Sequence, residues 1–419
     1  MSGFDWSPTA VVLAIGALVA ALPLAWFLLR QRGRCPTRER LRALAVLALV
    51  LTFDLVLVGA FTRLSDSGLG CPDWPGCYGH ASPIGARSHI AAAEAALPDG
   101  AVTHAKAWIE MAHRYLATGV GAVILVLAVW STVAWRRRAI AGPPRLAIAT
   151  LGWVVLQGLF GAFTVTLRLY PAIVTLHLLG GFALLVLLAL QAETLRARAL
   201  PVGRGVRALL AATAIAATLQ MALGGWVSTN YAVLACREFP LCQGAWWPAM
   251  DWDDGFAVLR ELGRTDEGTG LPFAALTAIH MAHRFGAAVV LPLLLALAWR
   301  LFSGGDRAAR PWAFALAGIA GWQTASGLAN VLLDWPLAAA LGHTGGAAAL
   351  AVVLTVLAAR MRPSAAPVSA HAGHASPSAR PMQPAQPASV ARGAEHCCAW
   401  RDGARPAAAD APCQSRLTR

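Results

Sequence analysis

The sequence predicts an all-α polytopic membrane protein with two tandem four-helix bundles, related by a pseudo-twofold repeat, and one extra transmembrane helix at the amino-terminal end. Three observations predict this class: the composition, a series of long apolar stretches and an internal repeat. Hydrophobic residues make up 57% of the 419 positions and charged residues only 13%. Soluble domains do not show this balance.

Nine stretches have the roughly 20 apolar residues that a helix needs to cross a bilayer. They are 9–29, 43–62, 108–135, 146–167, 172–194, 206–227, 273–300, 311–333 and 336–359. Several are rich in Gly and Ala, which is typical of helices whose backbones approach closely inside a membrane. The first stretch has no basic segment before it, so we expect a retained helix and not a cleavable signal peptide.

Arginine is concentrated in alternate loops, at 30–42, 136–145, 196–207 and 300–310, whereas most acidic residues lie in the intervening loops. This is the positive-inside pattern. It predicts that the amino terminus lies outside and that the arginine-rich loops and the carboxy-terminal tail lie in the cytoplasm. The distribution of the net charge of +13 therefore fits a chain embedded in membrane lipid, and we expect no binding of nucleic acid.

Four landmarks recur in the same order along the chain, which indicates a duplication. The segment from Gly59 to Cys77 recurs from Gly224 to Cys242, and Ile109–Arg114 recurs as Ile279–Arg284. Gly152-Trp153 with Gly158 recurs as Gly321-Trp322 with Gly327, and Pro171 with His177 recurs as Pro336 with His343. The expected units are an extra helix and basic loop (1–42), an amino-terminal half (43–200), a carboxy-terminal half (201–360) and a disordered tail (361–419).

Each half carries one histidine in its second helix (His113, His283) and one in its fourth (His177, His343). All four lie roughly 9–15 Å below the outer helix ends at about 1.5 Å per residue. Two imidazoles at matched depth on different helices can hold a haem iron from both faces. The alternative is that these histidines bridge helices by ordinary hydrogen bonds, but ionisable residues inside a membrane are functional candidates by default.

Two further features accompany the histidines. The pairs Gly180-Gly181 and Gly345-Gly346 would admit a flat ring, or would serve close helix packing. Arg114 and Arg284 each follow a histidine and are possible partners of haem propionates, because a guanidinium forks onto carboxylates. Helix dipoles or backbone carbonyls are the alternative partners of these arginines.

The two halves differ one turn before the second-helix histidine, where Glu110 stands opposite His280. Positions three apart share a helix face, so we expect Glu110 to point towards the same cavity as His113. A carboxylate there could act as a general base or stabilise positive charge; an interfacial acid near a helix end is the alternative. The asymmetry predicts chemistry in the amino-terminal half and electron transfer in the other.

Cys71 and Cys77, and likewise Cys236 and Cys242, fall in outer loops with a spacing that allows a local disulfide. Such a bridge would be structural or redox-active. Four other cysteines, Cys35, Cys397, Cys398 and Cys413, face the cytoplasm and should be free thiols. The tail histidines His371, His374 and His396 are expected to be solvated and not to bind metal.

The run TRLSDSGLGCPDWPGCYGH at 62–80, the EMAHR motif at 110–114 and the four histidines resemble the haem A synthase family, over roughly 43–360. The resemblance implies oxidation of a ring methyl of haem O to the formyl group of haem A, by successive hydroxylations with water as oxygen source, for cytochrome oxidase biogenesis. It implies that Glu110 is catalytic, that His113 and His177 hold the substrate haem, and that His283 and His343 are the iron ligands of a haem b cofactor.

The resemblance also implies that Cys71/Cys77 and Cys236/Cys242 are the family's two cysteine pairs, that the chain lies in a bacterial inner membrane, and that haem O synthase delivers the substrate. A homo-oligomer is possible. The extra helix, the tail and His280, which could compete as a ligand, depart from the family pattern. Two other functions stay open on the residues alone: a di-haem b-type electron-transfer protein and a disulfide–quinone oxidoreductase.

Overall fold

The computed structural model describes residues 7–30, 36–196, 199–265 and 267–363. Cys35, the three tail cysteines, the tail histidines and most of the predicted tail lie outside these residues. Nine long helices account for the nine predicted apolar stretches: α1 (Ser7–Arg30), α2 (Thr37–Leu64), α4 (His104–Arg136), α5 (Arg145–Thr166), α6 (Pro171–Thr194), α7 (Arg204–Thr229), α9 (Phe273–Ser303), α10 (Arg310–Leu332) and α11 (Leu337–Arg360).

Eight of these nine helices are long and apolar enough to cross a membrane, as judged by length and composition over the described ranges. The exception is α10. It has 23 residues, but Arg310, Gln323 and Asn330 reduce its mean hydropathy. The prediction of a multi-pass helical membrane protein is therefore confirmed for eight spans.

Several short elements lie in the loops and were not predicted. They are the helices α3 (Arg87–Ala96) and α8 (Trp252–Phe256), the 3₁₀ turn η1 (Ala232–Ala235), and the strands β1 (Leu200–Val202) and β2 (Met361–Pro363). The two strands pair in parallel, with Leu200 opposite Met361. A search for long apolar stretches cannot detect such elements, because the longest of them, α3, has only 10 residues.

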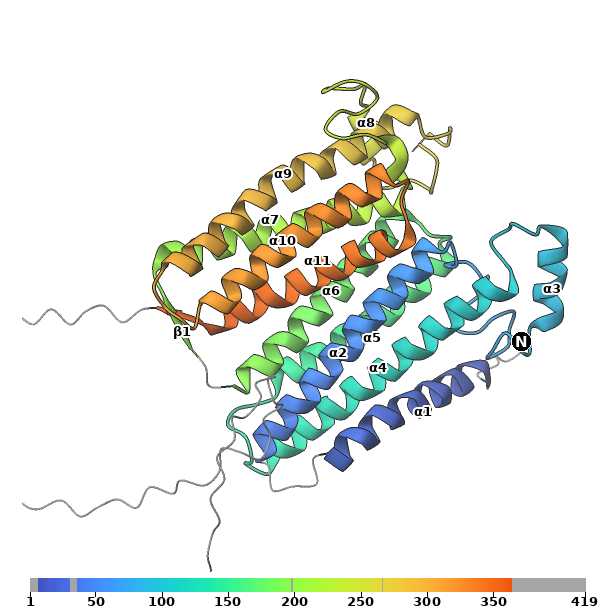
Figure 1. Cartoon of the computed structure of the whole chain (residues 1–419). Helices are drawn as coiled ribbons and strands as arrows, with labels where there is room; N and C mark the ends of the chain where they lie inside the picture. Colours follow the sequence, from blue (N-terminus) through green and yellow to red (C-terminus); the bar gives the residue numbers. More distant parts are fainter. Residues whose placement is uncertain (1–6, 31–35, 197–198, 266, 364–419) are drawn as a thin grey trace, which may run out of the picture.

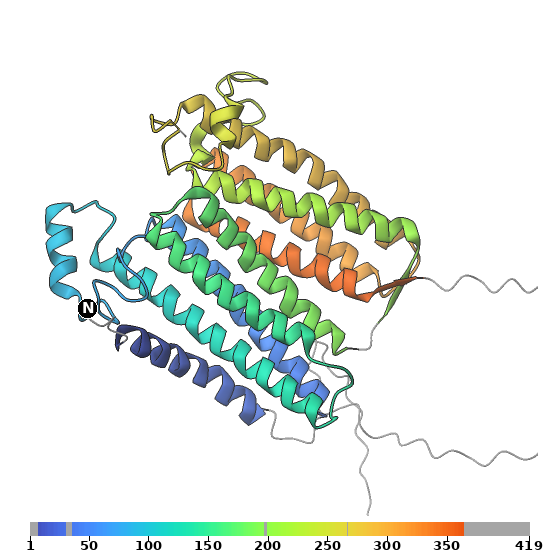
Figure 2. The same ribbon diagram turned by 180° about the vertical axis from the view of Figure 1, so that it is seen from behind.

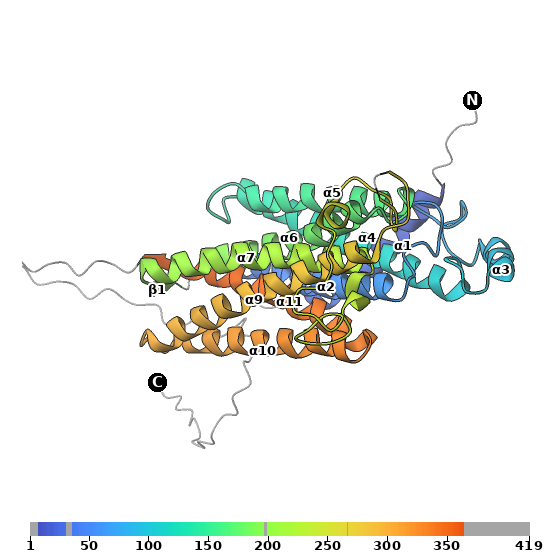
Figure 3. The same cartoon turned by 90° about the horizontal axis from the view of Figure 1, so that it is seen from above.

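The long helices lie side by side with their axes roughly aligned, as Figures 1 and 2 show from opposite sides. Helix α2 contacts α4, α6 and α11, while α5 contacts α4 and α6. Helix α7 contacts α6, α9 and α11, while α10 packs on α9 and α11. Helix α1 packs along α4 at the edge of the molecule. The loops with α3 and α8 emerge at one end and the strands at the other (Figure 1), and Figure 3 shows α3 and β1 at opposite ends from above.

Two apolar cores divide the long helices into two groups, α1, α2 and α4–α6 on one side and α7 and α9–α11 on the other, and both cores lie towards the end that carries the strands. One core contains Leu41, Leu44, Val123, Leu127 and Leu188, with Ala20 and Phe27 from α1; the other contains Leu210, Leu297, Leu316, Leu354 and Leu357. Large apolar side chains on the outer faces, such as Leu18, Leu219 and Val289, are exposed. This arrangement suits helices that face lipid and leaves the opposite end of each group for polar residues.

Candidate haem sites

All four predicted histidines lie within about three turns of the start of their helices, at the end of the molecule that carries the long loops. His113 lies in α4, His177 in α6, His283 in α9 and His343 in α11. The rings of His283 and His343 face one another with centroids 6.4 Å apart and planes at 75°. His113 and His177 lie on α4 and α6, which both pack against α2 and α5.

Each histidine ring rests against a glycine on a neighbouring helix. A Cβ built on Gly59 of α2 would lie 3.0 Å from Cε1 of His113, and one on Gly224 of α7 would lie 3.0 Å from Cε1 of His283. The same distances are 3.5 Å from Gly161 of α5 to His177 and 3.3 Å from Gly327 of α10 to His343. The glycines therefore leave just enough room for the imidazoles.

These contacts correct one detail of the sequence alignment. Gly158 had been matched with Gly327, but no atom lies within 4 Å of a Cβ built on Gly158, and Gly161 is the residue that touches His177. Gly161 and Gly327 each lie sixteen residues before their histidine. Arg168 and Leu169 have positive φ angles, and so do Asp334 and Trp335. These two pairs are separated by the same number of positions as Gly161 and Gly327.

The second ring nitrogen of each histidine has different surroundings in the two groups of helices. Nδ1 of His343 lies 2.9 Å from Oγ of Ser326, and Nδ1 of His283 lies 3.0 Å from Nε2 of Gln220. In contrast, Nδ1 of His113 and of His177 is buried without a hydrogen-bond partner among the described residues. The sequence had not identified Ser326 or Gln220 as site residues.

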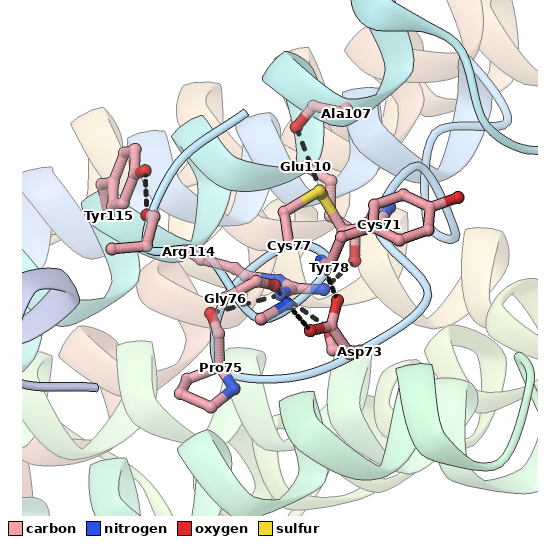
Figure 4. The surroundings of a disulfide bond; sticks show 12 residues. Cys71, Asp73, Pro75, Gly76, Cys77, Tyr78, Ala107, Glu110, Arg114 and Tyr115 are labelled. Atoms are coloured by element: carbon pink, nitrogen blue, oxygen red, sulfur yellow. Dashed lines mark hydrogen bonds and ion pairs between the residues drawn. A yellow bond between two sulfur atoms is a disulfide. The ribbon is translucent and has the colours of Figure 1, made fainter. Parts of the chain in front are cut away.

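Glu110 lies in α4 one turn before His113 and is only 3% exposed. Its Oε2 accepts a hydrogen bond of 2.8 Å from the backbone N–H of Cys71, and its Oε1 lies 2.5 Å from the guanidinium of Arg114. Figure 4 shows both contacts beside the Cys71–Cys77 disulfide. The carboxylate is thus held in one position by a backbone donor and a buried cation.

Arg114 connects this carboxylate to the first outer loop. Its guanidinium donates to the carbonyl oxygens of Asp73 at 2.9 Å and Pro75 at 3.2 Å, and also to that of Gly76 (Figure 4). The side chain is 8% exposed. In this structure the guanidinium therefore meets carbonyls, which was one of the two kinds of partner expected for it.

The second outer loop has the same architecture. Arg284 donates to the carbonyl oxygens of Glu238 at 2.7 Å and Leu241 at 3.0 Å. In place of Glu110, however, His280 places its Nδ1 3.0 Å from the carbonyl oxygen of Ala232. The two outer loops are therefore bound to their helices by a matching arginine, and they differ in the residue four positions before it, which is Glu110 in the first half and His280 in the second.

Both predicted disulfides are formed, Cys71–Cys77 and Cys236–Cys242. All four cysteines are fully buried. In each disulfide loop a carboxylate between the two cysteines accepts hydrogen bonds from backbone N–H groups just after the second cysteine. Asp73 accepts from Tyr78 and Gly79 at 2.6 Å, and Glu238 accepts from Gly244. The two acids had no predicted role, although both stand two residues after the first cysteine of their pair.

The TRLSDSG segment forms a polar contact between the two groups of helices. The Arg63 guanidinium lies 3.9 Å from the ring centroid of Tyr231 and donates to the carbonyl oxygen of Ser228 at 2.5 Å. The Tyr231 hydroxyl donates to Asp66 at 2.7 Å. Burial raises the pKa of Tyr231, which keeps the phenol protonated and able to donate.

Comparison with known proteins adds independent information. Residues 42–355 match the COX15-CtaA family, described as "Cytochrome oxidase assembly protein". The chain is 39% identical over 315 residues to "Heme A synthase" of Shewanella oneidensis, covering 74% of this chain and 93% of that protein. It is 32% identical to the protein of that name from Symbiobacterium thermophilum (73% and 90% covered) and 27% to that from Halalkalibacterium halodurans (72% and 91%). Because the family match includes all four histidines, Glu110 and both disulfides, this chain belongs to the COX15-CtaA family of cytochrome oxidase assembly proteins.

Proposed function

We infer that this chain acts as a haem A synthase, an oxidoreductase that converts haem O to haem A for cytochrome oxidase assembly. The observation that carries this function is the family match together with two pairs of half-buried imidazoles, and among the described residues Glu110 stands one turn before His113 where the second pair has His280. The finer assignments below are proposals that rest on the geometry of the site.

The two groups of four helices, α2 with α4–α6 and α7 with α9–α11, are two copies of one bundle in tandem. The support is local and repeated. In each copy, two histidine rings each rest against a glycine of a neighbouring helix. Each copy also has a disulfide loop whose backbone carbonyls accept hydrogen bonds from an arginine. Helix α10 belongs to the second copy as the counterpart of α5, so it crosses the membrane although it is less apolar than the others.

His113 and His177 hold the substrate haem O, and His283 and His343 hold a haem b cofactor. Neutral imidazole nitrogen is a ligand that suits haem iron, and the buried, unpartnered Nδ1 atoms of His113 and His177 fit residues whose other nitrogen faces a ligand. When bound, haem b would accept and pass on the electrons that leave the substrate. Arg114 and Arg284 remain candidates for propionate partners.

Glu110 is the catalytic base. Hydroxylation of a methyl group with water as oxygen source releases two protons and two electrons, so a proton acceptor is needed beside the substrate. Glu110 would take a proton from the attacking water at a carboxylate oxygen. Arg114 and the Cys71 N–H hold that carboxylate in place, which limits the loss of its orientation when the charge changes.

The chain spans a bacterial inner membrane with its disulfide loops outside and its arginine-rich loops in the cytoplasm. The arginine distribution supports this orientation, and oxidised cysteine pairs fit an oxidising compartment. Haem O synthase is the expected source of the substrate. A second function as a simple di-haem electron carrier would give Glu110 no role, and a disulfide–quinone oxidoreductase would not need two histidine pairs.

The test is expression of the full chain in a host that supplies haem O, followed by extraction and mass analysis of the bound haems. Wild type should yield haem O, haem A and haem b. Glu110→Gln should keep the haem absorbance spectrum but lower haem A production by about 10²–10⁴-fold, the contribution typical of a general base.

Glu94→Gln is the matched control, because Glu94 is a carboxylate of α3 whose hydrogen bond, from the backbone N–H of His104, joins α3 to the start of α4 and involves none of the four haem-site histidines. It should leave haem A production unchanged. Normal haem A production by Glu110→Gln would remove the proposed role of Glu110, whereas wild-type protein without any haem would contradict the function itself.

A further inference from the structure

The two histidine pairs differ in what their second nitrogen meets, and the difference is most clearly defined at His343. Ser326 of α10 is 5% exposed, and its hydroxyl lies 2.9 Å from Nδ1 of His343. The same hydroxyl lies 2.7 Å from the carbonyl oxygen of Trp322, one turn earlier in the helix.

A serine hydroxyl has one hydrogen and two acceptor lone pairs. Since the Trp322 carbonyl can only accept, the hydroxyl hydrogen goes there, and the oxygen is left to accept from His343. Nδ1 of His343 must then carry the proton. In a neutral imidazole this leaves the lone pair on Nε2, which is the form that binds a metal.

The backbone of His343 is fixed as well. In the amide orientation that satisfies both of its ends, Gln323 donates to the carbonyl oxygen of His343 at 3.0 Å and accepts from the N–H of Ala347 at 3.3 Å. On the other side, Gly327 lies against the ring at Cε1. The imidazole is thus constrained in position, ring orientation and tautomer before any ligand arrives.

The amino-terminal half keeps a glutamine at the position that matches Gln323, which is Gln157, but it lacks the serine hydroxyl. Ser326 directly precedes Gly327, and the residue that directly precedes Gly161 is Phe160, which cannot hydrogen-bond. Nδ1 of His177 accordingly has no partner among the described residues. At the other histidine of each pair, Gln220 stands four residues before Gly224, whereas Leu55 stands four residues before Gly59. The Gln220 contact is made by an amide N–H, which donates, so it does not fix the tautomer that Ser326 fixes and is not part of the proposal.

We propose that Ser326 is a positioning residue for the cofactor, which fixes the Nε2-binding tautomer of His343 and strengthens it as a ligand, and that Phe160 leaves the substrate pair without this support so that substrate and product can exchange. The proposal rests on the assignment of His283 and His343 to a resident haem b. A proton acceptor on the far nitrogen of a ligating imidazole raises its basicity, and loss of such a partner typically weakens metal binding by 10–100-fold.

The experiment uses the full chain with His113→Ala, so that the amino-terminal pair is broken and the remaining haem is held by the carboxy-terminal pair. It compares Ser326→Ala, Ser326→Thr and the control Thr324→Ala. Thr324 donates to the carbonyl of Ala320 on the same helix and makes no hydrogen bond to a histidine of the described residues. The readouts are the rate of haem transfer to excess apomyoglobin and the midpoint potential from a redox titration.

Ser326→Ala should lose haem about ten-fold faster and shift the midpoint potential to more positive values, because a less basic imidazole stabilises the ferric state less. Ser326→Thr, which keeps the hydroxyl, and Thr324→Ala should both behave like the parent. Unchanged haem loss and potential in Ser326→Ala would overturn the proposal, as would an equal effect of Thr324→Ala.

If Ser326→Ala does not yield folded protein, Ser326→Cys replaces the hydroxyl by a weaker acceptor of similar size and should give intermediate values; parent-like values would overturn the proposal. A parent protein that binds no haem at all would instead contradict the proposed function, so the two failures are distinguishable.

Discussion

Replacing the glycines that touch the histidines tests the site through its sterics alone. A methyl group on Gly224 would lie 3.0 Å from Cε1 of His283, whereas ordinary van der Waals contact begins at 3.4 Å. The imidazole would have to retreat by about 0.4 Å, close to the tolerance of about 0.5 Å that functional constellations allow. Gly59→Ala would displace His113 in the same way.

The magnitude follows from the cost of overpacking. An extra methyl group in a well-packed interior typically costs about 1–3 kcal/mol, and each 1.4 kcal/mol is a factor of ten in an equilibrium constant. If the cost falls on the ligand-binding geometry, haem affinity should fall by about 5- to 150-fold. The helix itself should gain, because alanine is favoured over glycine in a helix interior by about 1 kcal/mol.

Gly161→Ala is the matched control, because its methyl group would make an ordinary 3.5 Å contact with His177. The assay is haem content per purified protein, with far-ultraviolet circular dichroism to show that helix content is retained. We expect haem loss for Gly224→Ala and Gly59→Ala with intact helix content, and near-normal loading for Gly161→Ala. Full loading of Gly224→Ala, or equal loss in Gly161→Ala, would refute the steric reasoning.

Two other perturbations give expected outcomes. Glu193→Gln breaks a two-pronged 2.7 Å ion pair with Arg360 that joins α6 to α11. Because both side chains are mostly buried, we expect the free energy of unfolding in detergent to fall by about 3–5 kcal/mol. Glu261→Gln breaks an exposed 3.9 Å ion pair with Arg264 and should change the free energy of unfolding by less than about 0.5 kcal/mol. A larger effect of Glu261→Gln would show that burial does not explain the difference between the two ion pairs. The double change Cys71→Ser with Cys77→Ser removes a short cross-link worth about 2 kcal/mol, and it should lower haem A production more than haem content because the Cys71 N–H holds the catalytic carboxylate. Equal losses of the two would argue for a purely structural bridge.

The helices were predictable because each depends on a local run of apolar residues. The observed bounds differ mainly at the polar ends: α2 begins at Thr37, before the apolar stretch at 43–62, and α4 begins at His104, before 108. Polar residues outside the apolar stretch can continue a helix at no cost to its hydrogen bonding. Hydropathy therefore marks the membrane-embedded part of a helix and not its full length.

The disulfides were predictable for a related reason, since two cysteines six positions apart with a proline between them can close a short local loop. What fills such a loop was not predictable. Asp73 and Arg114 are 41 positions apart in the sequence, and their contact depends on how the loop folds over α4. The sequence gives the chemical types of these residues but not the carbonyls that they meet.

The sequence by itself determined the helical membrane class, the positions of the four histidines and the one-sided glutamate, because these follow from residue type and from spacing along single helices. Only the tertiary structure decided which glycine touches each imidazole and that His343 has a serine at Nδ1 while His177 has none. Such contacts depend on the rotation and axial register of one helix against another. Packing between helices sets that register, and a three-residue error in alignment, as between Gly158 and Gly161, is enough to hide it.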